Sequence, residues 1–336
     1  MKIDIFNHIF PSKLREALLK LKPSLETHRQ LVQNTTQPAL WDMDYRCKML
    51  SEYENVVQVL TIAEAPFDLL SPREANDIVK IGNNEMAEII SKHPHQFIAG
   101  VATLPQTDIE AMLNETDRGI KELGFKGVQL TTNINGKALD SPEFMPLYEK
   151  MADYDLPIWI HPHRSREMSD YQSEAHSKYG IHGLFGWPYE TAVAMTRLIF
   201  SGILDKYPNL KFITHHCGGM VPFFEQRIRS WYDLAEQDGL KGEKEFIQGL
   251  AKRPVEYFKM FYNDTALYGS TPALMCGFAF FGAEHILFGT DMPFDKEHGH
   301  RHLRETIRSL EQMGIPDSDK EKIFEQNARK LLRFPK

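Results

Sequence analysis

Short apolar runs separated by longer segments of helical periodicity are the feature that most constrains how this chain can fold. The runs are rich in β-branched residues and recur eight times, with apolar residues at three- and four-residue spacing in between. This alternation is typical of βα units arranged around a parallel sheet. We therefore expect an α/β fold in which residues 1–336 form a single (β/α)8 TIM-barrel domain.

The same patterns predict where the elements lie. The expected strands are Ile3–Phe6, Val56–Ile62, Phe97–Ala102, Gly127–Leu130, Pro157–His161, Lys211–His215, Met260–Asp264 and Ile286–Gly289. The expected helices are Pro72–Lys92, Thr107–Leu123, Pro142–Tyr154, Tyr189–Phe200, Pro222–Asp238, Glu243–Lys252, Thr271–Phe281, Arg301–Met313 and Asp319–Leu332. Ser71 is the expected N-cap of the first of these helices, because a proline at the first helical position follows it.

Two connections are longer than ordinary barrel loops. They run from Pro11 to Tyr53, after the first expected strand, and from His163 to Trp187, after the fifth. Long βα connections lie at the C-terminal face of a barrel, where active sites are found. We expect these two segments to act as lids over the site.

Composition and charge exclude several classes of function. The formal charge is −7, without a basic stripe carrying interleaved aromatic residues, so nucleic acid is not an expected partner. No apolar run approaches the roughly 18 to 20 residues that span a bilayer, so no membrane anchor is expected. Three cysteines without a CxxC pair, and no signal-peptide pattern in the first residues, predict a cytoplasmic protein.

Polar residues occur where the expected strands end. His8, His161, His216 and Asp291 each follow or close a different strand, as do His215 and Asp264. Positions at the C-terminal ends of barrel strands converge, so these side chains can share one metal ion or one substrate. Imidazole and carboxylate ligands suit Zn²⁺ and also accept Mn²⁺ or Fe²⁺.

Four segments make a more specific match. They are Met1–Pro11, Ile160–His163, Ile213–Phe223 and Leu287–Phe294, with support from Leu123–Gln129 and Gly186–Thr191. Together they resemble the signatures of the aminocarboxymuconate-semialdehyde decarboxylase branch of the amidohydrolase superfamily, which also contains dihydroxybenzoate decarboxylases. The resemblance covers nearly the whole chain.

The resemblance implies roles for individual residues. His8, His161 and Asp291 match the family's metal ligands, and His216 matches a histidine that acts on metal-bound water or on the substrate carbon. Arg227 matches an arginine that reaches across a subunit interface to a substrate carboxylate, a group that guanidinium binds with two parallel hydrogen bonds. A homodimer or higher homo-oligomer is therefore expected.

One position departs from the family pattern. The family's first strand carries His-x-His or Glu-x-His, and here the first of these positions is Phe6, which has no lone pair for a metal. Because neighbouring residues of a strand point to opposite faces, His215 is not expected to compensate beside His216. His163, two residues past His161, is the expected spare ligand and a candidate for substrate binding.

Several further residues have two readings. Phe10 and Trp187, with Tyr189, are candidates for an aromatic-substrate pocket, and core packing is the alternative. Asp264 is a candidate for orienting a ligand through a hydrogen bond. The cluster from Asp295 to His302 is expected to be a solvated loop, and a second metal site is the alternative.

The reaction implied by the resemblance is the metal-dependent, non-oxidative decarboxylation of a small aromatic or unsaturated carboxylic acid, without an organic cofactor. Two alternatives stay open on the same barrel: hydrolysis of a lactone or cyclic ester, or a hydratase reaction. A third is a binding protein that lost its metal through Phe6. The resemblance also implies an additional substrate-binding arginine in the stretch Gln33–Ala39. That stretch contains none, which argues against the dicarboxylate substrate of the enzyme that gives the branch its name.

Overall fold

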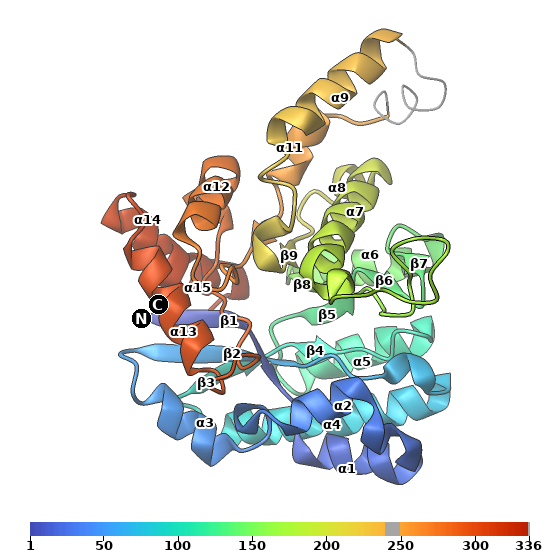
Figure 1. Ribbon diagram of the computed structural model, residues 1–336, viewed down its shortest axis with the longest axis vertical. Helices are drawn as coiled ribbons and strands as arrows, with labels where there is room; N and C mark the ends of the chain where they lie inside the picture. The colour runs from blue at the N-terminus through green and yellow to red at the C-terminus, as the bar shows by residue number, and fades with distance from the viewer. Residues whose placement is uncertain (239–248, 335–336) are drawn as a thin grey trace.

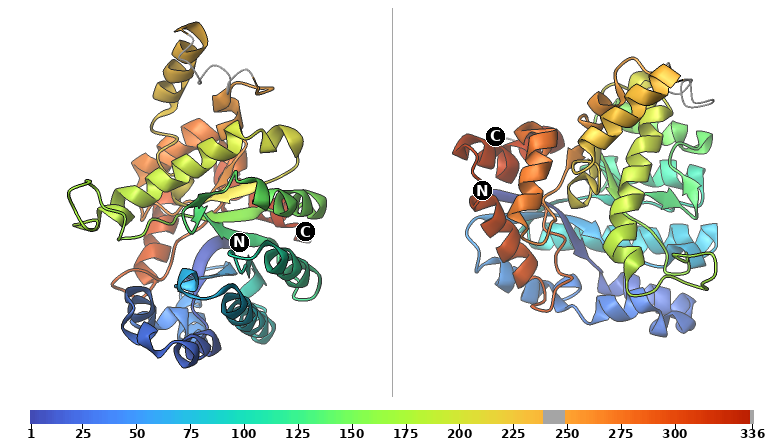
Figure 2. Two further views of the ribbon diagram at one scale, coloured as in Figure 1. Left: turned by 90° about the vertical axis from the view of Figure 1, so that its right-hand side faces the viewer. Right: turned by 45° about the horizontal axis from the view of Figure 1, so that its top comes forward.

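The structure is a computed structural model and describes residues 1–238 and 249–334. Parallel strands form the centre, and helices surround them (Figures 1 and 2). The N-terminal strand and the C-terminal helices lie next to each other, so the first and last parts of the chain meet. The predicted barrel is confirmed.

The strands are short and, outside one small hairpin, all parallel. They are β1 (Lys2–Ile9), β2 (Val56–Ile62), β3 (Phe97–Gly100), β4 (Ala102–Thr103), β5 (Val128–Thr131), β8 (Ile158–His161), β9 (Phe212–Thr214) and β10 (Tyr262–Asn263), with the hairpin β6 (Asn133–Ile134) and β7 (Lys137–Ala138). The parallel order is β1-β2-β3 in one sheet and β10-β9-β8-β5-β4 in the other. Seven of the eight expected strand positions therefore carry regular strands.

The eighth position closes the barrel by backbone hydrogen bonds. The amide of Leu287 donates to the carbonyl oxygen of Asn263 at 2.8 Å, and the amide of Ile5 donates to that of Phe288 at 2.9 Å. Ile286 also forms a parallel bridge with Asn263. The segment after residue 285 thus lies between β10 and β1, as predicted.

The helices surround this barrel. They are α1 (Ser12–Leu21), α2 (Arg29–Thr35), α3 (Met43–Leu50), α4 (Pro72–Lys92), α5 (Ile109–Lys121), α6 (Met145–Tyr154), α7 (Trp187–Phe200), α8 (Ile203–Lys206), α9 (Glu225–Asp238), α11 (Pro254–Phe258), α12 (Thr271–Phe281), α13 (His300–Glu311), α14 (Asp317–Glu321) and α15 (Asn327–Leu332). Short 3-10 or π turns are η1 (Pro23–Thr27), η2 (Pro38–Leu40), η3 (Phe67–Leu69), η4 (Pro142–Phe144), η5 (His182–Gly186), η6 (His216–Gly218), η7 (Ala283–His285) and η8 (Lys322–Gln326).

Sequence signals fixed some helix boundaries well. Helix α4 has the expected bounds, and Ser71 forms a capping box with Glu74 in which each side chain bonds the other's backbone amide. Helix α12 also has the expected bounds. Most of the expected helix Glu243–Lys252 lies outside the described residues. Within the described residues, no helix combines the length and the apolarity that crossing a membrane requires.

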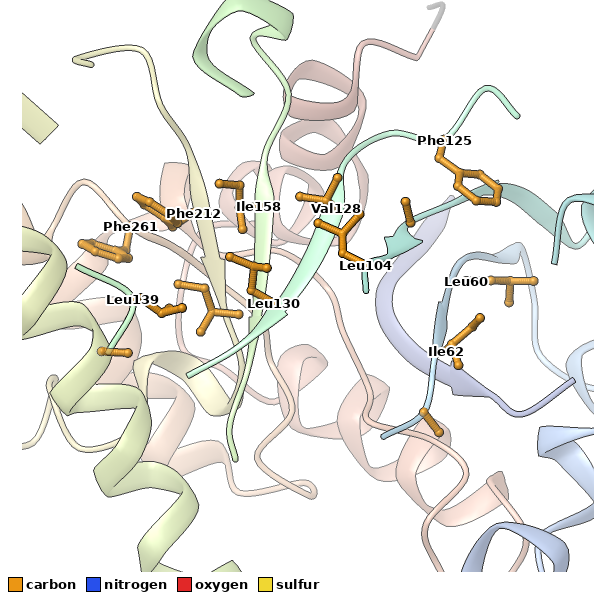
Figure 3. Packing of buried hydrophobic residues seen from close by; sticks show 14 of the residues in the cluster. Leu60, Ile62, Leu104, Phe125, Val128, Leu130, Leu139, Ile158, Phe212 and Phe261 are labelled. Atoms are coloured by element: carbon orange, nitrogen blue, oxygen red, sulfur yellow. The ribbon is translucent and has the colours of Figure 1, made fainter. Parts of the chain in front are cut away.

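Buried apolar residues fill the barrel on both sides of its wall. Leu60, Leu130 and Phe212 belong to the layer between strands and helices (Figure 3). A second cluster includes Val59 and Trp159. Several of its strand residues are adjacent in sequence to residues of the first cluster, as Val59 is to Leu60. Because strand residues alternate in direction, this second set fills the barrel interior. The polar residues at the strand ends lie at the mouth above this interior.

The two long connections differ in character. Residues 11–53 contain α1 to α3, and Leu14 and Leu18 of α1 are fully buried. Residues 163–187 are mostly irregular, with Tyr171 and Tyr179 strongly exposed. Their role as lids stays a prediction.

Candidate active site

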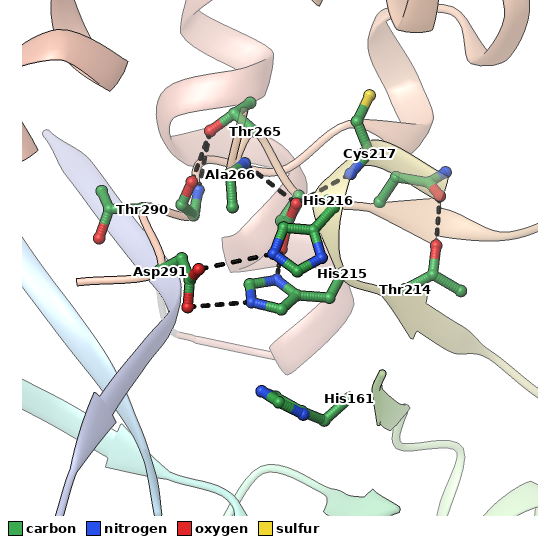
Figure 4. A network of polar contacts seen from close by, with 12 residues as sticks. His161, Thr214, His215, His216, Cys217, Thr265, Ala266, Thr290 and Asp291 are labelled. Carbon is green, nitrogen blue, oxygen red and sulfur yellow. Dashed lines mark hydrogen bonds and ion pairs between the residues drawn. The ribbon is translucent and has the colours of Figure 1, made fainter. Parts of the chain in front are cut away.

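Three histidines and one aspartate from four strand ends meet at the mouth of the barrel. His8 is on β1, His161 ends β8, His215 follows β9, and Asp291 follows the closing segment. Each is at most 5% exposed. One ligand atom from each of His8, His161 and His215 lies within 4.8 Å of the others. Figure 4 shows His161, His215 and Asp291 gathered at this point. We call these four residues the metal cluster, meaning a cluster of side chains that could hold one metal ion.

The carboxylate of Asp291 divides the site. Its Oδ1 lies 3.2 Å from Nε2 of His8 and 3.2 Å from Nε2 of His215. Its Oδ2 accepts a 2.9 Å hydrogen bond from the hydroxyl of Tyr268 and lies 3.5 Å from Nε2 of His216. Oδ1 thus faces the histidines of the metal cluster, and Oδ2 faces the pair Tyr268 and His216.

Hydrogen bonds at Nδ1 orient two of the imidazoles. The hydroxyl of Thr61 donates to a backbone carbonyl, so it accepts from Nδ1–H of His8 at 3.0 Å. Nδ1–H of His161 donates to the carbonyl oxygen of Pro162 at 2.8 Å. In both neutral rings the lone pair is therefore on Nε2, the arrangement that metal-binding histidines adopt.

His215 is held between two carboxylates. Its Nδ1 bonds Asp264, which also accepts the backbone amide of Cys217 at 3.1 Å. Burial alone lowers the pKa of His215, but Asp264 and Asp291 outweigh burial and raise the pKa to about 10. Asp264 thus orients a site residue, the role considered for it from the sequence.

The other titratable groups follow the same balance. Burial, reinforced by the nearby imidazoles, holds the pKa of His161 well below its usual range. Burial also lowers the pKa of His8 and of His216. Burial by itself raises the pKa of Asp291. The surrounding imidazoles, of which His215 has the largest effect, nevertheless hold that pKa well below its usual range. Near neutral pH the metal-free site therefore pairs a carboxylate with a protonated His215.

Comparison with known proteins agrees with this geometry. The Amidohydrolase family profile matches residues 34–334. The chain belongs to the amidohydrolase family. It is 30% identical over 294 residues to a 2-amino-3-carboxymuconate-6-semialdehyde decarboxylase of Dictyostelium discoideum, covering 87% of this chain and 77% of that protein. It is also 30% identical to a gamma-resorcylate decarboxylase of Polaromonas sp. strain JS666, covering 87% of each.

A solved relative extends the comparison to three dimensions. The dihydroxybenzoic acid decarboxylase of Polaromonas sp. JS666, determined with bound manganese and 2-nitroresorcinol, superposes with a TM-score of 0.78. It is 26% identical and covers 99% of this chain and 96% of that chain. The likeness therefore extends over the whole amidohydrolase barrel.

Two expectations about spare ligands in this amidohydrolase are wrong. His215 belongs to the metal cluster, because strand alternation stops at Thr214 and His216 has a left-handed φ of 53°. The two rings consequently lie side by side, with centroids 4.0 Å apart. His163 instead bonds Glu64 outside the cluster.

Phe6 supports the cluster from below. Its ring stacks on the imidazole of His215 with centroids 3.9 Å apart, and lies 6.1 Å from that of His161. An apolar ring at the family's ligand position thus packs against the histidine that stands in the site. This contact offers no ligand atom, as expected.

Tyr268 is the site residue that sequence reasoning missed. Because its hydroxyl donates to Asp291, the same oxygen accepts from Nε2–H of His216 at 3.1 Å. Tyr268 also has a left-handed φ of 54°. The available signal was its position on the connection after β10, which a barrel brings to the mouth.

Of the remaining predicted site residues, one lies beside the metal cluster and two lie elsewhere. The ring of Trp187 lies 5.9 Å from that of His161, and its buried Nε1–H has no hydrogen-bond partner. Phe10 is packed in the hydrophobic core, the alternative that the sequence left open. Arg227 is exposed on α9, which projects from the barrel in Figure 1.

The loop after Asp291 is not the solvated loop that was expected. Asp295 and His302 are buried, and the carboxylate of Asp295 accepts the backbone amides of Gly299 and His302 at 3.1 and 3.0 Å. Nδ1–H of His302 donates to the carbonyl oxygen of Asp291 at 3.1 Å. This loop therefore fixes the backbone of a cluster residue and begins α13.

A hollow with both polar and apolar lining residues opens beside the metal cluster. It has a volume of about 70 Å³ and is bounded by the ends of β2, β4, β5 and β8. Its lining includes His161 together with Glu64, Gln129 and His163. A molecule held at His161 thus has room to extend on this side.

Proposed function

We propose that this amidohydrolase is a metal-dependent, non-oxidative decarboxylase of a small aromatic or unsaturated carboxylic acid and needs no organic cofactor. The observation that carries the proposal is the metal cluster, in which the buried Nε2 atoms of His8 and His215 both lie 3.2 Å from one carboxylate oxygen of Asp291. The decarboxylases among its relatives support the reaction type.

The residues present fit a divalent cation. His8, His161 and Asp291 are the proposed ligands, with His215 as the fourth in place of the ligand lost at Phe6. Imidazole and carboxylate donors suit Zn²⁺, our first choice, and also accept Mn²⁺ or Fe²⁺. The manganese in the Polaromonas relative makes Mn²⁺ the first alternative. When bound, such an ion supplies an electrophilic centre that draws electron density from the carbon losing CO₂.

The chain's own groups supply the proton. Decarboxylation breaks the bond between the carboxylate and its carbon, releases CO₂, and requires one proton on that carbon. His216 is the proposed donor, and Asp291, a carboxylate that must first accept a proton, is the proposed relay, since Tyr268 connects Nε2 of His216 to Oδ2 of Asp291 by two hydrogen bonds. The unpartnered Nε1–H of Trp187 is available to bind an oxygen of the acid.

A second subunit is proposed to complete the site. Phe223 and Trp231, before and within α9, are 79% and 49% exposed, and Arg227 lies between them. Aromatic residues with arginine are enriched in interface cores. We propose that α9 packs against a second copy of the chain, so that Arg227 binds the substrate carboxylate of the partner.

Mixing of inactive subunits tests this arrangement. If Arg227 acts on the partner's site, His216→Asn subunits combined with Arg227→Ala subunits regain activity after exchange, because one site of the heterodimer is intact. Verified exchange without recovered activity would refute the shared site.

The protein is also proposed to reside in the cytoplasm. Its three cysteines, Cys47, Cys217 and Cys276, are unpaired, which fits a reducing compartment. The proposed partner is a small carboxylic acid, and neither nucleic acid nor membrane is proposed.

Release of CO₂ tests the reaction directly. Protein stripped of metal and reloaded with Zn²⁺ or Mn²⁺ is incubated with a panel of hydroxybenzoic and unsaturated acids, and CO₂ and the decarboxylated product are measured. The proposal predicts metal-dependent release of both in equal amounts. Consumption of a lactone or an unsaturated acid with uptake of water and no CO₂ would instead identify a hydrolase or a hydratase.

A further inference from the structure

Three buried oxygen atoms on residues that line the hollow beside His161 have no hydrogen-bond partner. The two on the most buried residues are Oε1 of Gln129 and Oγ1 of Thr103, whose residues are 7% and 5% exposed, and the third is Oγ1 of Thr107. Nε2–H of Gln129 donates to the carbonyl oxygen of Ile62 at 3.2 Å, which fixes the orientation of the amide. Buried polar atoms are nearly always paired, so these three indicate a ligand.

Two side chains on the wall of this hollow offer hydrogen-bond acceptors near His161. Glu64 contributes a carboxylate that bonds Nδ1 of His163, and Gln129 contributes a carbonyl oxygen. Among the described residues that line the hollow there is no lysine and no arginine. Such a lining stabilises a group that donates hydrogen bonds and repels a second negative charge.

The size of the hollow sets a further limit. Because one water needs about 10 to 15 Å³, the hollow, with its volume of about 70 Å³, holds roughly five to seven waters. That space fits one edge of a ring with a small substituent. His161 borders both the hollow and the metal cluster, so one molecule can contact both.

We propose that this hollow is a specificity subsite that takes an uncharged hydrogen-bond donor, a hydroxyl or amino group, on the acid bound at the metal cluster. Glu64 and Gln129 accept from that group, and Glu64 disfavours a substrate with a second carboxylate. The inference rests on the proposed function only in assigning an organic acid to the cluster.

Binding measurements can test the subsite without turnover. The Mn²⁺-loaded full chain is titrated calorimetrically with benzoate, with 2- and 3-hydroxybenzoate, and with the matching benzene-1,2- and benzene-1,3-dicarboxylates. We expect at least one hydroxybenzoate to bind about 10-fold more tightly than benzoate, and both dicarboxylates to bind more weakly than benzoate.

Two variants assign the selectivity to residues. Glu64→Gln keeps the size of the side chain and removes its charge, so the penalty against dicarboxylates should fall about 10-fold. Gln129→Leu removes the acceptor and should abolish the hydroxyl preference, so that the hydroxybenzoates and benzoate bind with equal affinity. Glu143→Gln, at an exposed ion pair with Lys137, is the matched control and should behave as the wild type.

The outcomes separate this inference from the proposed function. Hydroxyl preference with the expected variant effects, but no CO₂ from any acid, would support the subsite and refute the decarboxylase. Metal-dependent CO₂ release with unchanged selectivity in both variants would refute the subsite alone. Tighter binding of a dicarboxylate than of its hydroxybenzoate counterpart in the wild type would also refute it.

Discussion

The two sides of the barrel mouth differ in how their buried polar groups are hydrogen-bonded. On the side of β9, β10 and the closing segment, polar groups bond one another, as in the pairs His215–Asp264 and Tyr268–Asp291. On the side of β2, β4, β5 and β8, buried acceptors such as Oε1 of Gln129 have no partner. The groups of the first side hold one another in place around the position where a metal ion is proposed to bind, and the acceptors of the second side are open to a substrate.

Backbone conformation reinforces this contrast. Asp291, His216 and Tyr268 all have left-handed φ angles between 53° and 57°. Such conformations are unfavourable for residues other than glycine and persist where the surrounding structure enforces them, often at functional sites. The paired side therefore holds its groups at fixed positions for chemistry, and the unpaired side selects what enters.

The largest expected effect comes from the paired side. His216→Asn should lower turnover by roughly 10² to 10⁴, the range for losing a general acid or base, while metal content stays normal. Steady-state kinetics together with elemental analysis measure both quantities.

His163→Asn is the matched change on the unpaired side. It should act mainly on KM, with a smaller effect on turnover, because His163 lies outside the metal cluster. Equal losses of turnover in the two variants would remove the distinction between the two sides.

A smaller effect is expected from pH. With its pKa near 10, His215 is protonated in the metal-free protein at neutral pH, whereas His8 and His161, with lowered pKa values, are neutral. A metal ion at His215 must displace that proton, so affinity should rise about 10-fold for each pH unit between about pH 6 and pH 8. Calorimetry in buffers of different ionisation enthalpy counts the proton released.

Asp264→Asn provides the control for this pH effect. Loss of the carboxylate lowers the pKa of His215, and the dependence of metal affinity on pH should become shallower. A metal affinity that does not change with pH in the wild type would contradict the account of His215.

The smallest effect is expected at Tyr268. Tyr268→Phe removes the donor to Oδ2 of Asp291 and the acceptor for His216, and should weaken Mn²⁺ binding by about 10-fold, as is typical of groups that orient ligands. Electron paramagnetic resonance of free Mn²⁺ measures this loss. Tyr171→Phe, at a strongly exposed tyrosine, should change nothing; an equal loss in both variants would show that the hydroxyl of Tyr268 has no specific role.

The sequence predicted those parts of the fold that depend on local pattern. Alternating apolar runs located the strands, and Ser71 with the following proline located the start of α4. Polar residues at strand ends identified His8, His161 and Asp291, because a barrel brings all strand ends to one face.

The sequence could not predict features that depend on how the chain turns after a strand. His215 joins the cluster because the backbone leaves the extended conformation at His216, where strand alternation no longer applies. Tyr268 reaches Asp291 through an irregular connection without periodicity. Helices α1 to α3 were missed for a related reason, since they are short and interrupted by the prolines that begin η1 and η2.

An anomalous diffraction map of crystals grown with Mn²⁺ tests the central claim that His215 replaces the ligand lost at Phe6. The account predicts one peak at about 2.0 to 2.3 Å from Nε2 of His8, His161 and His215 and from Oδ1 of Asp291, the usual range for such ligands. The absence of a peak among these four side chains, or a peak that His215 does not contact, would contradict the account.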